Sequence, residues 1–503
     1  MHTFADPLRR ALQVAPNKIG LIDGERRFSF SELHDRCTRL AGALHALGLR
    51  KGDRVAILAA NSHVYMETYL AVPASGLVVV PLNTRHAKPE LRYALEDSAT
   101  KILITDRDVG DLADCVDRVL GVDDYEALLA GASAIALGND VTENDLAGLF
   151  YTGGTTGKSK GVMLSHRNLI ANTFHWLMTV PRCADDVELV MAPMFHAAGS
   201  NGILGSIWNA AAQITLGTFA PDAALDIVAE HGVTHTLAVP TMLSAMAETQ
   251  HVSPRKVDSL KVISHGGSPA ATEVLRRSRT AFPHAELVEL YGATELSPLI
   301  TALRYEQTLI DTPRARSCGQ SIPGTEVRVL SADGEPLPPG EVGEVVARGP
   351  NVMQGYWNKE EQTAAVLKDG AYWTGDLGYF DEDGYLFLVD RSKDMIVTGG
   401  ENVYSTEVEE ALFRHPAVLE AAAFGVPDTK WGEAVHAVIV PRPGHEGVDP
   451  ADIIKFCHGE IAGYKVPKAI DVSHEPLPKS GPGKVLKRDL RAPFWEGTDR
   501  SVN

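Results

Sequence analysis

The chain has 503 residues, which is too long for a single compact core, so two or more domains are expected. Apolar residues make up 44% and charged residues 22%, the balance of an ordinary soluble globular protein. Its 47 basic and 65 acidic residues give a formal net charge of −18, which argues against nucleic acid as a partner, because binding to a phosphate backbone needs a concentrated basic surface.

The sequence indicates an enzyme of the cytoplasm. Residues 1–7 contain no apolar stretch of the kind found in secretory signals. The best candidate for a membrane span, residues 69–82, is too short to cross a bilayer and contains two prolines. The five cysteines are scattered, with no CxxC pair, which is typical of reduced and mostly buried thiols.

Short apolar runs alternate with helical patterns in the first third of the chain. Residues 54–58, 77–82 and 101–105 are rich in Val, Ile and Leu and predict strands. Residues 89–98 form an amphipathic pattern that predicts a helix between two of them. Such alternation predicts an α/β fold with buried, largely parallel sheets.

A loop rich in Gly, Thr and Lys follows an apolar strand at residues 149–162. Glycines let backbone N–H groups turn toward an anion, threonine hydroxyls add donors and lysine adds positive charge, so the loop is suited to a polyphosphate. It differs from the P-loop G-x-x-x-x-G-K-[ST], because Thr152 stands where that motif needs glycine. Residues 162–164 moreover predict a strand, whereas a P-loop lysine begins a helix.

The pattern changes between residues 319 and 348. Residues 327–330 and 343–347 predict antiparallel strands of a hairpin with an Asp333-Gly334 turn. Beyond the polar stretch 391–394, a helix (405–414), two strands (418–424 and 434–441) and a further helix (449–461) predict a small α+β domain.

Further motifs follow the phosphate loop in a fixed order. They are the segments Ala192-Pro193-Met194-Phe195-His196, Gly266-Gly267-Ser268-Pro269, Tyr291-Gly292-Ala293-Thr294-Glu295, Trp373-Thr374-Gly375-Asp376 and Pro478-Lys479-Ser480-Gly481-Pro482-Gly483-Lys484. Together with the loop from Thr152 to Gly161, they resemble the adenylate-forming superfamily of acyl- and aryl-CoA synthetases, firefly luciferases and peptide-synthetase adenylation domains. The resemblance covers nearly the whole chain. In the family loop T-S-G-T-T-G-x-P-K-G, this chain has Gly153 in place of Ser and Ser159 in place of Pro.

The resemblance implies how ATP and Mg²⁺ are bound. In the phosphate loop, Thr155 is expected to act in catalysis, and Thr152, Gly153, Gly154, Thr156, Gly157 and Lys160 to bind ATP. Adenine is expected beside Gly267, Ser268, Gly292 and the ring of Tyr291. Thr294 would contact the α-phosphate, and Glu295 would hold Mg²⁺, since a hard cation needs a carboxylate beside the phosphates that it bridges. Asp376 and Arg391 would bind the ribose hydroxyls.

The resemblance also implies a second, mobile domain. It predicts a large N-terminal domain (1–391) with two αβ-layered sheets and a small antiparallel β subdomain, followed by a small mobile α+β domain (392–503). Lys393 would be the hinge, Lys484 the lysine that stabilises charge during adenylation, and Gly399, Gly400 and Glu401 the loop that approaches coenzyme A. His196 would border the acid's carboxylate or gate the route to coenzyme A.

These roles imply an ATP-dependent acid–CoA ligase that forms an acyl-adenylate and then a thioester. A medium- or long-chain fatty acid is the leading substrate, with an aryl or phenylpropanoid acid second. A dicarboxylic acid is disfavoured, because no Arg or Lys stands in the segments expected to line the acid cavity. A CoA-independent fatty acyl-AMP ligase and a non-catalytic nucleotide-binding protein are the alternatives. A homodimer and transient contact with a membrane stay open.

Overall fold

The computed structural model describes residues 3–152, 159–268, 270, 272–305, 309–391, 394–479 and 485–495, and only the backbone of Asn201 and Arg391. The chain forms two compact units. The first comprises residues 1–327 and 346–373, and the second residues 328–345 and 374–503. The domain boundary expected between residues 391 and 392 stays a prediction.

The larger sheet of the first unit has the strand order β15-β14-β13-β12-β11-β9-β10-β1-β2. Its strands from β13 to β1 run parallel, and the outer strands β14, β15 and β2 are antiparallel to their neighbours. The bounds are β1 (Ile19–Asp23), β2 (Arg26–Ser29), β9 (Val187–Val190), β10 (Ala212–Thr215), β11 (His235–Ala238), β12 (Val262–Gly266), β13 (Glu286–Gly292), β14 (Leu299–Tyr305) and β15 (Gln320–Ser321).

The second sheet of this unit has the order β18-β8-β7-β4-β3-β5-β6. Its bounds are β3 (Arg54–Leu58), β4 (Val78–Pro81), β5 (Ile102–Thr105), β6 (Arg118–Gly121), β7 (Leu146–Thr152), β8 (Lys160–Ser165) and β18 (Gly355–Tyr356). Strands β7, β4, β3, β5 and β6 run parallel to one another, as the apolar runs predicted, and β8 is antiparallel to β7 and to β18. The predicted helix between two of them is α4 (Lys88–Asp97).

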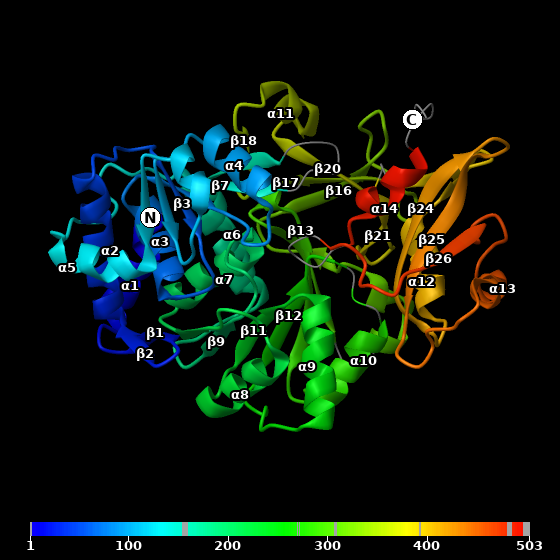
Figure 1. Ribbon diagram of the computed structural model, residues 1–503, viewed down its shortest axis with the longest axis horizontal. Helices are drawn as coiled ribbons and strands as arrows, with labels where there is room; N and C mark the ends of the chain where they lie inside the picture. Colours follow the sequence, from blue (N-terminus) through cyan, green and yellow to red (C-terminus); the bar gives the residue numbers. More distant parts are fainter. Residues whose placement is uncertain are drawn as a thin grey trace. The chain divides into compact units, whose positions relative to one another are not determined.

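Helices separate the two sheets. Helix α3 (His63–Ala74) contacts β1 of the larger sheet and β4 of the second, and α6 (His166–Thr179) contacts β14 and β8 (Figure 1). All twelve residues of α3 are buried, as expected of a helix covered on every side. The other face of the larger sheet carries α8 (Pro221–His231) and α9 (Pro240–Val252).

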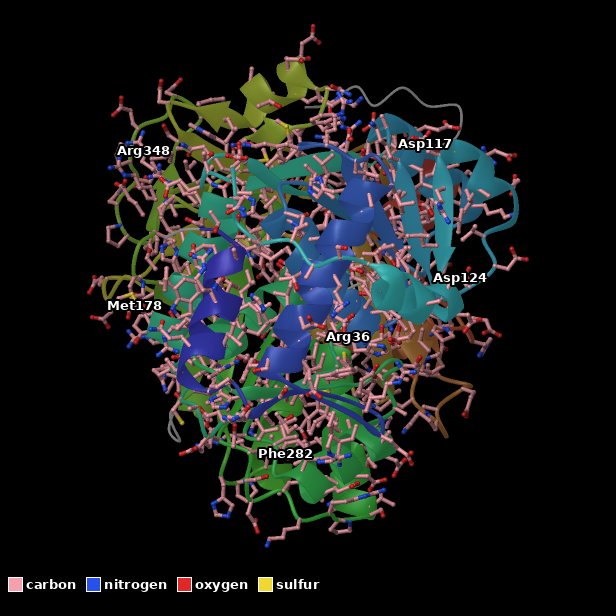
Figure 2. The ribbon with its side chains drawn as sticks, turned by 90° about the vertical axis from the view of Figure 1, so that its left-hand side faces the viewer. Arg36, Asp117, Asp124, Met178, Phe282 and Arg348 are labelled. Carbon is pink, nitrogen blue, oxygen red and sulfur yellow. The ribbon has the colours of Figure 1, made fainter. Side chains whose placement is uncertain are left out.

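The remaining helices of this unit complete the layers. They are α1 (Ala5–Val14), α2 (Phe30–Ala46), α5 (Val122–Gly131), α7 (Ala197–Trp208), α10 (Thr272–Ala281) and α11 (Glu360–Val366). On α2, Arg36 forms ion pairs with Glu67 of α3 at 2.6 Å and Glu126 of α5 at 2.9 Å, so one guanidinium joins three helices. Arg36 is labelled in Figure 2.

A five-stranded sheet has the order β16-β17-β20-β19, with β21 paired to β20, and β19 and β21 are antiparallel to β20. Its strands are β16 (Glu326–Leu330), β17 (Gly343–Arg348), β19 (Leu367–Lys368), β20 (Ala371–Phe380) and β21 (Leu386–Arg391). Strand β17 lies next to β16, but the Asp333-Gly334 turn does not join them directly. It returns the chain to Pro336, which bridges to Leu330, and β17 starts only at Gly343.

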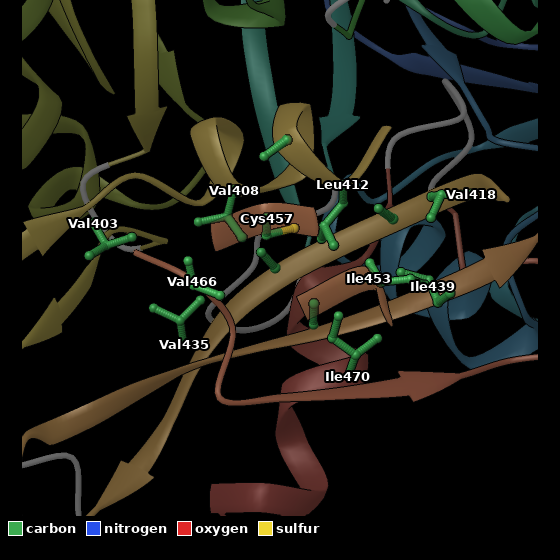
Figure 3. Packing of buried hydrophobic residues seen from close by; sticks show 14 of the residues in the cluster. Val403, Val408, Leu412, Val418, Val435, Ile439, Ile453, Cys457, Val466 and Ile470 are labelled. Carbon is green, nitrogen blue, oxygen red and sulfur yellow. The ribbon is translucent and has the colours of Figure 1, made fainter. Parts of the chain in front are cut away.

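The C-terminal part of the second unit matches the predicted small α+β domain. It contains β22 (Ile396–Thr398), β23 (Glu401–Val403), α12 (Ser405–Phe413), β24 (Val418–Asp428), β25 (Gly432–Pro441), α13 (Pro450–Glu460), β26 (Ala469–Val472) and α14 (Lys487–Trp495). Val408 and Leu412 of α12 pack with Ile453 of α13 and with Val435 and Ile439 of β25 (Figure 3). None of the helices in the described part of the chain is long and apolar enough to cross a membrane.

Candidate active site

The carboxyl ends of adjacent parallel strands bring several predicted site residues to one edge of the larger sheet. Gly266 of β12 pairs with Leu290 of β13, so Gly267 and Ser268 follow β12 beside Tyr291 and Gly292. In open α/β sheets ligands bind at this edge. A Cβ atom on Gly292 would lie 1.8 Å from the carbonyl oxygen of Pro298, so only glycine allows this approach of the two chain segments.

The phosphate loop joins two antiparallel strands. Thr152 at the end of β7 pairs with Lys160 at the start of β8. Residues 153–158, and with them the predicted site residues Gly153, Gly154, Thr155, Thr156 and Gly157, lie outside the described residues. The strand after the loop confirms the prediction for residues 162–164 and excludes a P-loop, in which a helix would follow.

Glu295 lies in the short helix η2 (Thr294–Leu296), and its carboxylate is held by Tyr356 of β18. The Tyr356 hydroxyl donates a hydrogen bond of 2.7 Å to Oε1 of Glu295, and the Lys160 Nζ lies 4.5 Å from the centre of the Tyr356 ring. Burial and the charge of Glu295 raise the pKa of Tyr356, so the phenol stays protonated and remains a donor. Tyr356 thus brings a carboxylate and a cation together at the end of the phosphate loop.

This arrangement fits Mg²⁺ bound together with a nucleotide. Among the described residues no group of three or more His, Cys, Asp or Glu side chains is placed to hold a metal ion. Mg²⁺ usually keeps one or two carboxylates, with waters and phosphate oxygens completing its shell. A half-buried Glu295, with Oε1 engaged by Tyr356, leaves Oε2 for such a role.

A small pocket lies between α6, α7 and the end of β9. It is lined by Trp176, Glu188, Leu189, Val190, Met191, Ala192, Ala198, Gly199, Gly202, Ile203 and Leu237. His196 immediately precedes α7, and its ring centre lies 4.5 Å from that of Phe195. The pocket therefore coincides with the segment expected to bind the acid.

His265, which directly precedes the Gly266-Gly267 segment, does not line this pocket. It is fully buried and stacks on Tyr305 with ring centres 5.7 Å apart. The reason is strand alternation, since Val262, on the opposite face of β12, is the residue that clusters with Trp176. Among the described residues the pocket lining holds no Arg or Lys, and Arg182, outside the lining, reaches Glu188 at 3.1 Å.

In the second unit, the predicted ribose contacts Asp376 and Arg391 are backbone partners in the β20–β21 pair. The Asp376 amide donates to Thr374 Oγ1 at 3.0 Å, and the Gly375 amide donates to Glu344 Oε1 at 2.9 Å. These bonds fix the backbone that carries the Asp376 carboxylate.

The expected hinge, Lys393, lies outside the described residues. The segments before and after it are hydrogen-bonded to each other. The buried Asp390 carboxylate accepts a bond of 2.6 Å from the Ser405 amide. Lys487 forms an ion pair of 2.7 Å with Glu409 and donates to Ser405 Oγ at 2.5 Å.

The predicted coenzyme A loop is a turn between β22 and β23. Gly399 has a φ of 61°, and its amide donates to the Trp431 carbonyl oxygen at 2.8 Å. Trp431 is 45% exposed and therefore does not belong to the core. Glu401 is exposed at the start of β23. Lys484 lies outside the described residues. Lys479 and Val485, which come before and after it in the chain, form a β-bridge.

Comparison with known proteins agrees with the order of these motifs. The model of the AMP-binding enzyme family matches residues 8–357, and that of the AMP-binding enzyme C-terminal domain matches residues 407–484. The chain belongs to the AMP-binding enzyme family. The resemblance to adenylate-forming acyl-CoA synthetases is therefore confirmed.

Members of the family align over nearly the full chain. Feruloyl-CoA synthase from Amycolatopsis sp is 38% identical over 97% of this chain and 98% of its own. Long-chain-fatty-acid–CoA ligase from Bacillus subtilis is 34% identical over 94% of this chain and 91% of its own. ATP-bound MatB from Rhodopseudomonas palustris superposes with a TM-score of 0.90 at 33% identity, covering 97% and 99% of the two chains. The similarity to solved structures confirms the predicted α/β architecture, with a large N-terminal and a small C-terminal domain.

The sequence did not reveal two side-chain contacts of this AMP-binding enzyme, that of Tyr356 with Glu295 and that of Arg182 with Glu188. Tyr356 is 61 residues from Glu295, and no local pattern marks Gly355-Tyr356-Trp357 as part of a site. Arg182 and Glu188 are six residues apart in a stretch with three acidic residues, which is typical of a solvated turn. Only tertiary packing shows that both side chains are buried.

Proposed function

We propose that this chain is an ATP-dependent acid–CoA ligase that converts a largely apolar carboxylic acid into its CoA thioester. The observation that carries the proposal is the contact of Tyr356 with both Glu295 and Lys160. This contact supports the proposal that Glu295 serves Mg²⁺ and that Lys160 serves a phosphate. Relatives support the reaction class, since those cited above are a CoA synthase and a CoA ligase.

In the first half-reaction, the acid's carboxylate oxygen attacks the α-phosphorus of ATP in line, and the bond to the leaving pyrophosphate breaks. Lys484 is the residue that we expect to stabilise the charge developing at the α-phosphate. Thr294 would donate to the same phosphate, and Asp376 with Arg391 would hold the ribose. Mg²⁺ held by Glu295 would supply charge neutralisation on the phosphates.

In the second half-reaction, the CoA thiolate attacks the acyl carbonyl, and AMP leaves with the electron pair of the broken acyl–oxygen bond. Gly399, Gly400 and Glu401 would border the pantetheine arm. Lys393 is the proposed hinge for exchanging Lys484 against this loop. A Lys393→Pro variant that retained both half-reactions at wild-type rates would contradict this role.

The pocket bears on the choice of acid. The wall residues Trp176 and Glu188 add polar atoms, which favours an aryl acid over an unsubstituted fatty acid. A medium-chain fatty acid is the second candidate, because most of the other lining residues are aliphatic.

The test is AMP formation by purified protein from ATP, across aliphatic acids of increasing length and a set of aromatic acids, with and without CoA. AMP formation that requires both an acid and CoA supports the ligase. Acid-dependent pyrophosphate release without a thioester would point to an acyl-AMP ligase or a carrier-protein acceptor. No turnover with any acid would contradict catalysis.

A Lys484→Ala variant provides the control. Its acid-dependent pyrophosphate release should fall by about 10²–10³. Lys479→Ala, five residues earlier on the same loop, should not reproduce this loss. The cytoplasmic location, the homodimer and the transient membrane contact stay predictions.

A further inference from the structure

Glu188, in the wall of the acid pocket, belongs to a buried ion pair whose other member, Arg182, lies behind the lining. Arg182 and Glu188 have side chains only 1% and 5% exposed, and two bonds join them: Nε to Oε2 at 3.1 Å and Nη2 to Oε1 at 3.2 Å. The Ser206 hydroxyl of α7 also donates to Oε2. Because removing both charges from water is costly, such a pair contributes little to stability and calls for another explanation.

Two hydrogen-bond donors beside this pair have no partner among the described residues. They are Nη1 of Arg182 and Nε1 of Trp176, and both atoms are buried. The Arg182 guanidinium carbon lies 5.6 Å from the centre of the Trp176 ring, so the donors belong to one cluster. Buried donors are normally satisfied, and leaving one unpaired is unfavourable.

Gly202 of α7 leaves Glu188 accessible from the pocket. A Cβ atom at this position would lie 3.1 Å from Oε1 of Glu188, and both residues line the pocket. Oε1 accepts a single bond, that from Arg182 Nη2, among the bonds of the described residues, while a carboxylate oxygen can accept two. The pocket wall therefore offers an acceptor next to unpaired donors.

We propose that Arg182, Glu188 and Trp176 form a subsite that binds a hydroxyl group at the far end of the acid substrate. The hydroxyl donates to Oε1 of Glu188 and accepts from Nη1 of Arg182 or Nε1 of Trp176. The inference rests on the proposed acid–CoA ligase function and names its substrate class, a carboxylic acid with a distal hydroxyl.

The charge of the pair selects against a second carboxylate. Arg182 alone would attract an anion, but the carboxylate of Glu188, 3.1 Å from the Arg182 guanidinium, neutralises the positive charge. A carboxylate placed near Oε1 would meet a like charge in a site shielded from water. A neutral group that both donates and accepts is the complement of the subsite, and a hydroxyl is the simplest such group.

The experiment compares kcat/KM for matched acids that differ by one hydroxyl: 4-hydroxycinnamic against cinnamic acid, and 8-hydroxyoctanoic against octanoic acid. We expect the wild-type protein to prefer the hydroxylated member of at least one pair by about tenfold or more, because the subsite leaves buried polar groups unpaired when the hydroxyl is missing. Equal kcat/KM values in both pairs would overturn the subsite while leaving the ligase function intact. No CoA-dependent turnover of any acid would instead contradict the proposed function itself.

Variants then assign the preference to the pair. Replacing both charges together, Arg182→Met with Glu188→Leu, avoids an unpaired buried charge and should bring the ratio of the two kcat/KM values close to one. Gly202→Ala covers Oε1 with a methyl group and should lower the same ratio, which keeps the test decisive if the double variant does not fold. A ratio unchanged in Gly202→Ala and in a folded double variant would refute the assignment.

A second ion pair provides the matched control. Arg304 and Glu286 form a similar two-bond pair at 2.6 and 2.5 Å, but neither residue lines the pocket. Arg304→Met with Glu286→Leu should leave the ratio of kcat/KM values as in the wild type. A loss of preference in this control would show that the ratio reports general damage and would overturn the subsite.

Discussion

The hydroxyl of Tyr356 donates a hydrogen bond of 2.7 Å to Oε1 of Glu295, joining strand β18 to the short helix η2. The Met353 amide donates to the Glu295 carbonyl oxygen at 2.8 Å, so backbone and side chain of the same residue are both held. A carboxylate fixed in this way is preorganised for a cation, since it loses little freedom on binding.

Glu295→Gln should abolish most adenylation. The amide keeps the shape of the side chain but removes the charge that Mg²⁺ requires, so acid-dependent pyrophosphate release should fall by about 10²–10³. The measurement is the rate of pyrophosphate release against Mg²⁺ concentration. Tyr356→Phe keeps the carboxylate and loses one hydrogen bond, so its rate should fall by about tenfold. Full activity of Glu295→Gln at low Mg²⁺ would rule out the role of this residue.

Asp376→Asn should weaken ATP binding selectively. The amide retains one acceptor oxygen but replaces the other with a donor, so a second ribose hydroxyl can no longer donate to it. We expect the KM for ATP to rise by about tenfold with little change in the KM for the acid. Asp381→Asn, at the turn between β20 and β21, is the control and should leave the KM for ATP unchanged. A change in the KM for the acid alone would refute the assignment.

Gly399→Ala should slow thioester formation more than adenylate formation. A Cβ atom there would lie 2.8 Å from Cε3 of Trp431, and φ is 61°, so both sterics and backbone strain oppose alanine. CoA-dependent AMP release should fall by about tenfold, while pyrophosphate release in a single turnover without CoA should persist. Gly444→Ala has a φ of 86° with nothing within 4 Å, and therefore tests strain without the clash. Equal effects of both variants would mean that the contact with Trp431 is irrelevant.

Glu289 gives a stability prediction that depends on pH. Burial raises its pKa from 4.5 to about 7, and the hydroxyl of Tyr305 donates to it. Below pH 4.5 the carboxyl is protonated in both the folded and unfolded states. As pH rises from 4.5 to about 7 the unfolded chain ionises first, so the contribution of Glu289 to the free energy of unfolding decreases and then levels off.

Glu289→Gln removes this dependence. Relative to the variant, the wild-type free energy of unfolding should fall on the order of 3 kcal/mol across this range, as urea unfolding at several pH values would measure. The neighbouring His265, whose pKa burial lowers to about 4, is present in both proteins and cancels in the difference. A difference that stayed constant with pH would contradict the raised pKa.

Local patterns predicted much of the fold. Runs such as residues 54–58 and 101–105 carry their strand signal within a few residues, and the structure has β3 and β5 there. The amphipathic residues 89–98 likewise correspond to α4, displaced by one residue. The strands predicted at residues 327–330 and 343–347 are present as β16 and β17. The Asp333-Gly334 turn does not join them directly, because it returns the chain to Pro336, and local turn chemistry does not indicate which segment pairs after the turn.

The sequence could predict site residues only where they stand close together in one short motif. Gly292, Thr294 and Glu295 stand in one motif, and the structure places them at the end of β13. Tyr356 and Arg182 contribute through tertiary contacts, which a single sequence does not encode locally. His265 stood next to a recognised motif, yet strand alternation turned it to the other face of the sheet.

The bond from the Ser405 amide to the Asp390 carboxylate spans the proposed hinge at Lys393. A rotation about Lys393 would pull these two groups apart and leave a buried carboxylate without its backbone donor. If the small domain rotates about Lys393 as proposed, each cycle would break this bond and form it again, so the strength of the bond would contribute to the energy barrier of the rotation. Substitutions of Asp390 would then change turnover without contacting the substrate.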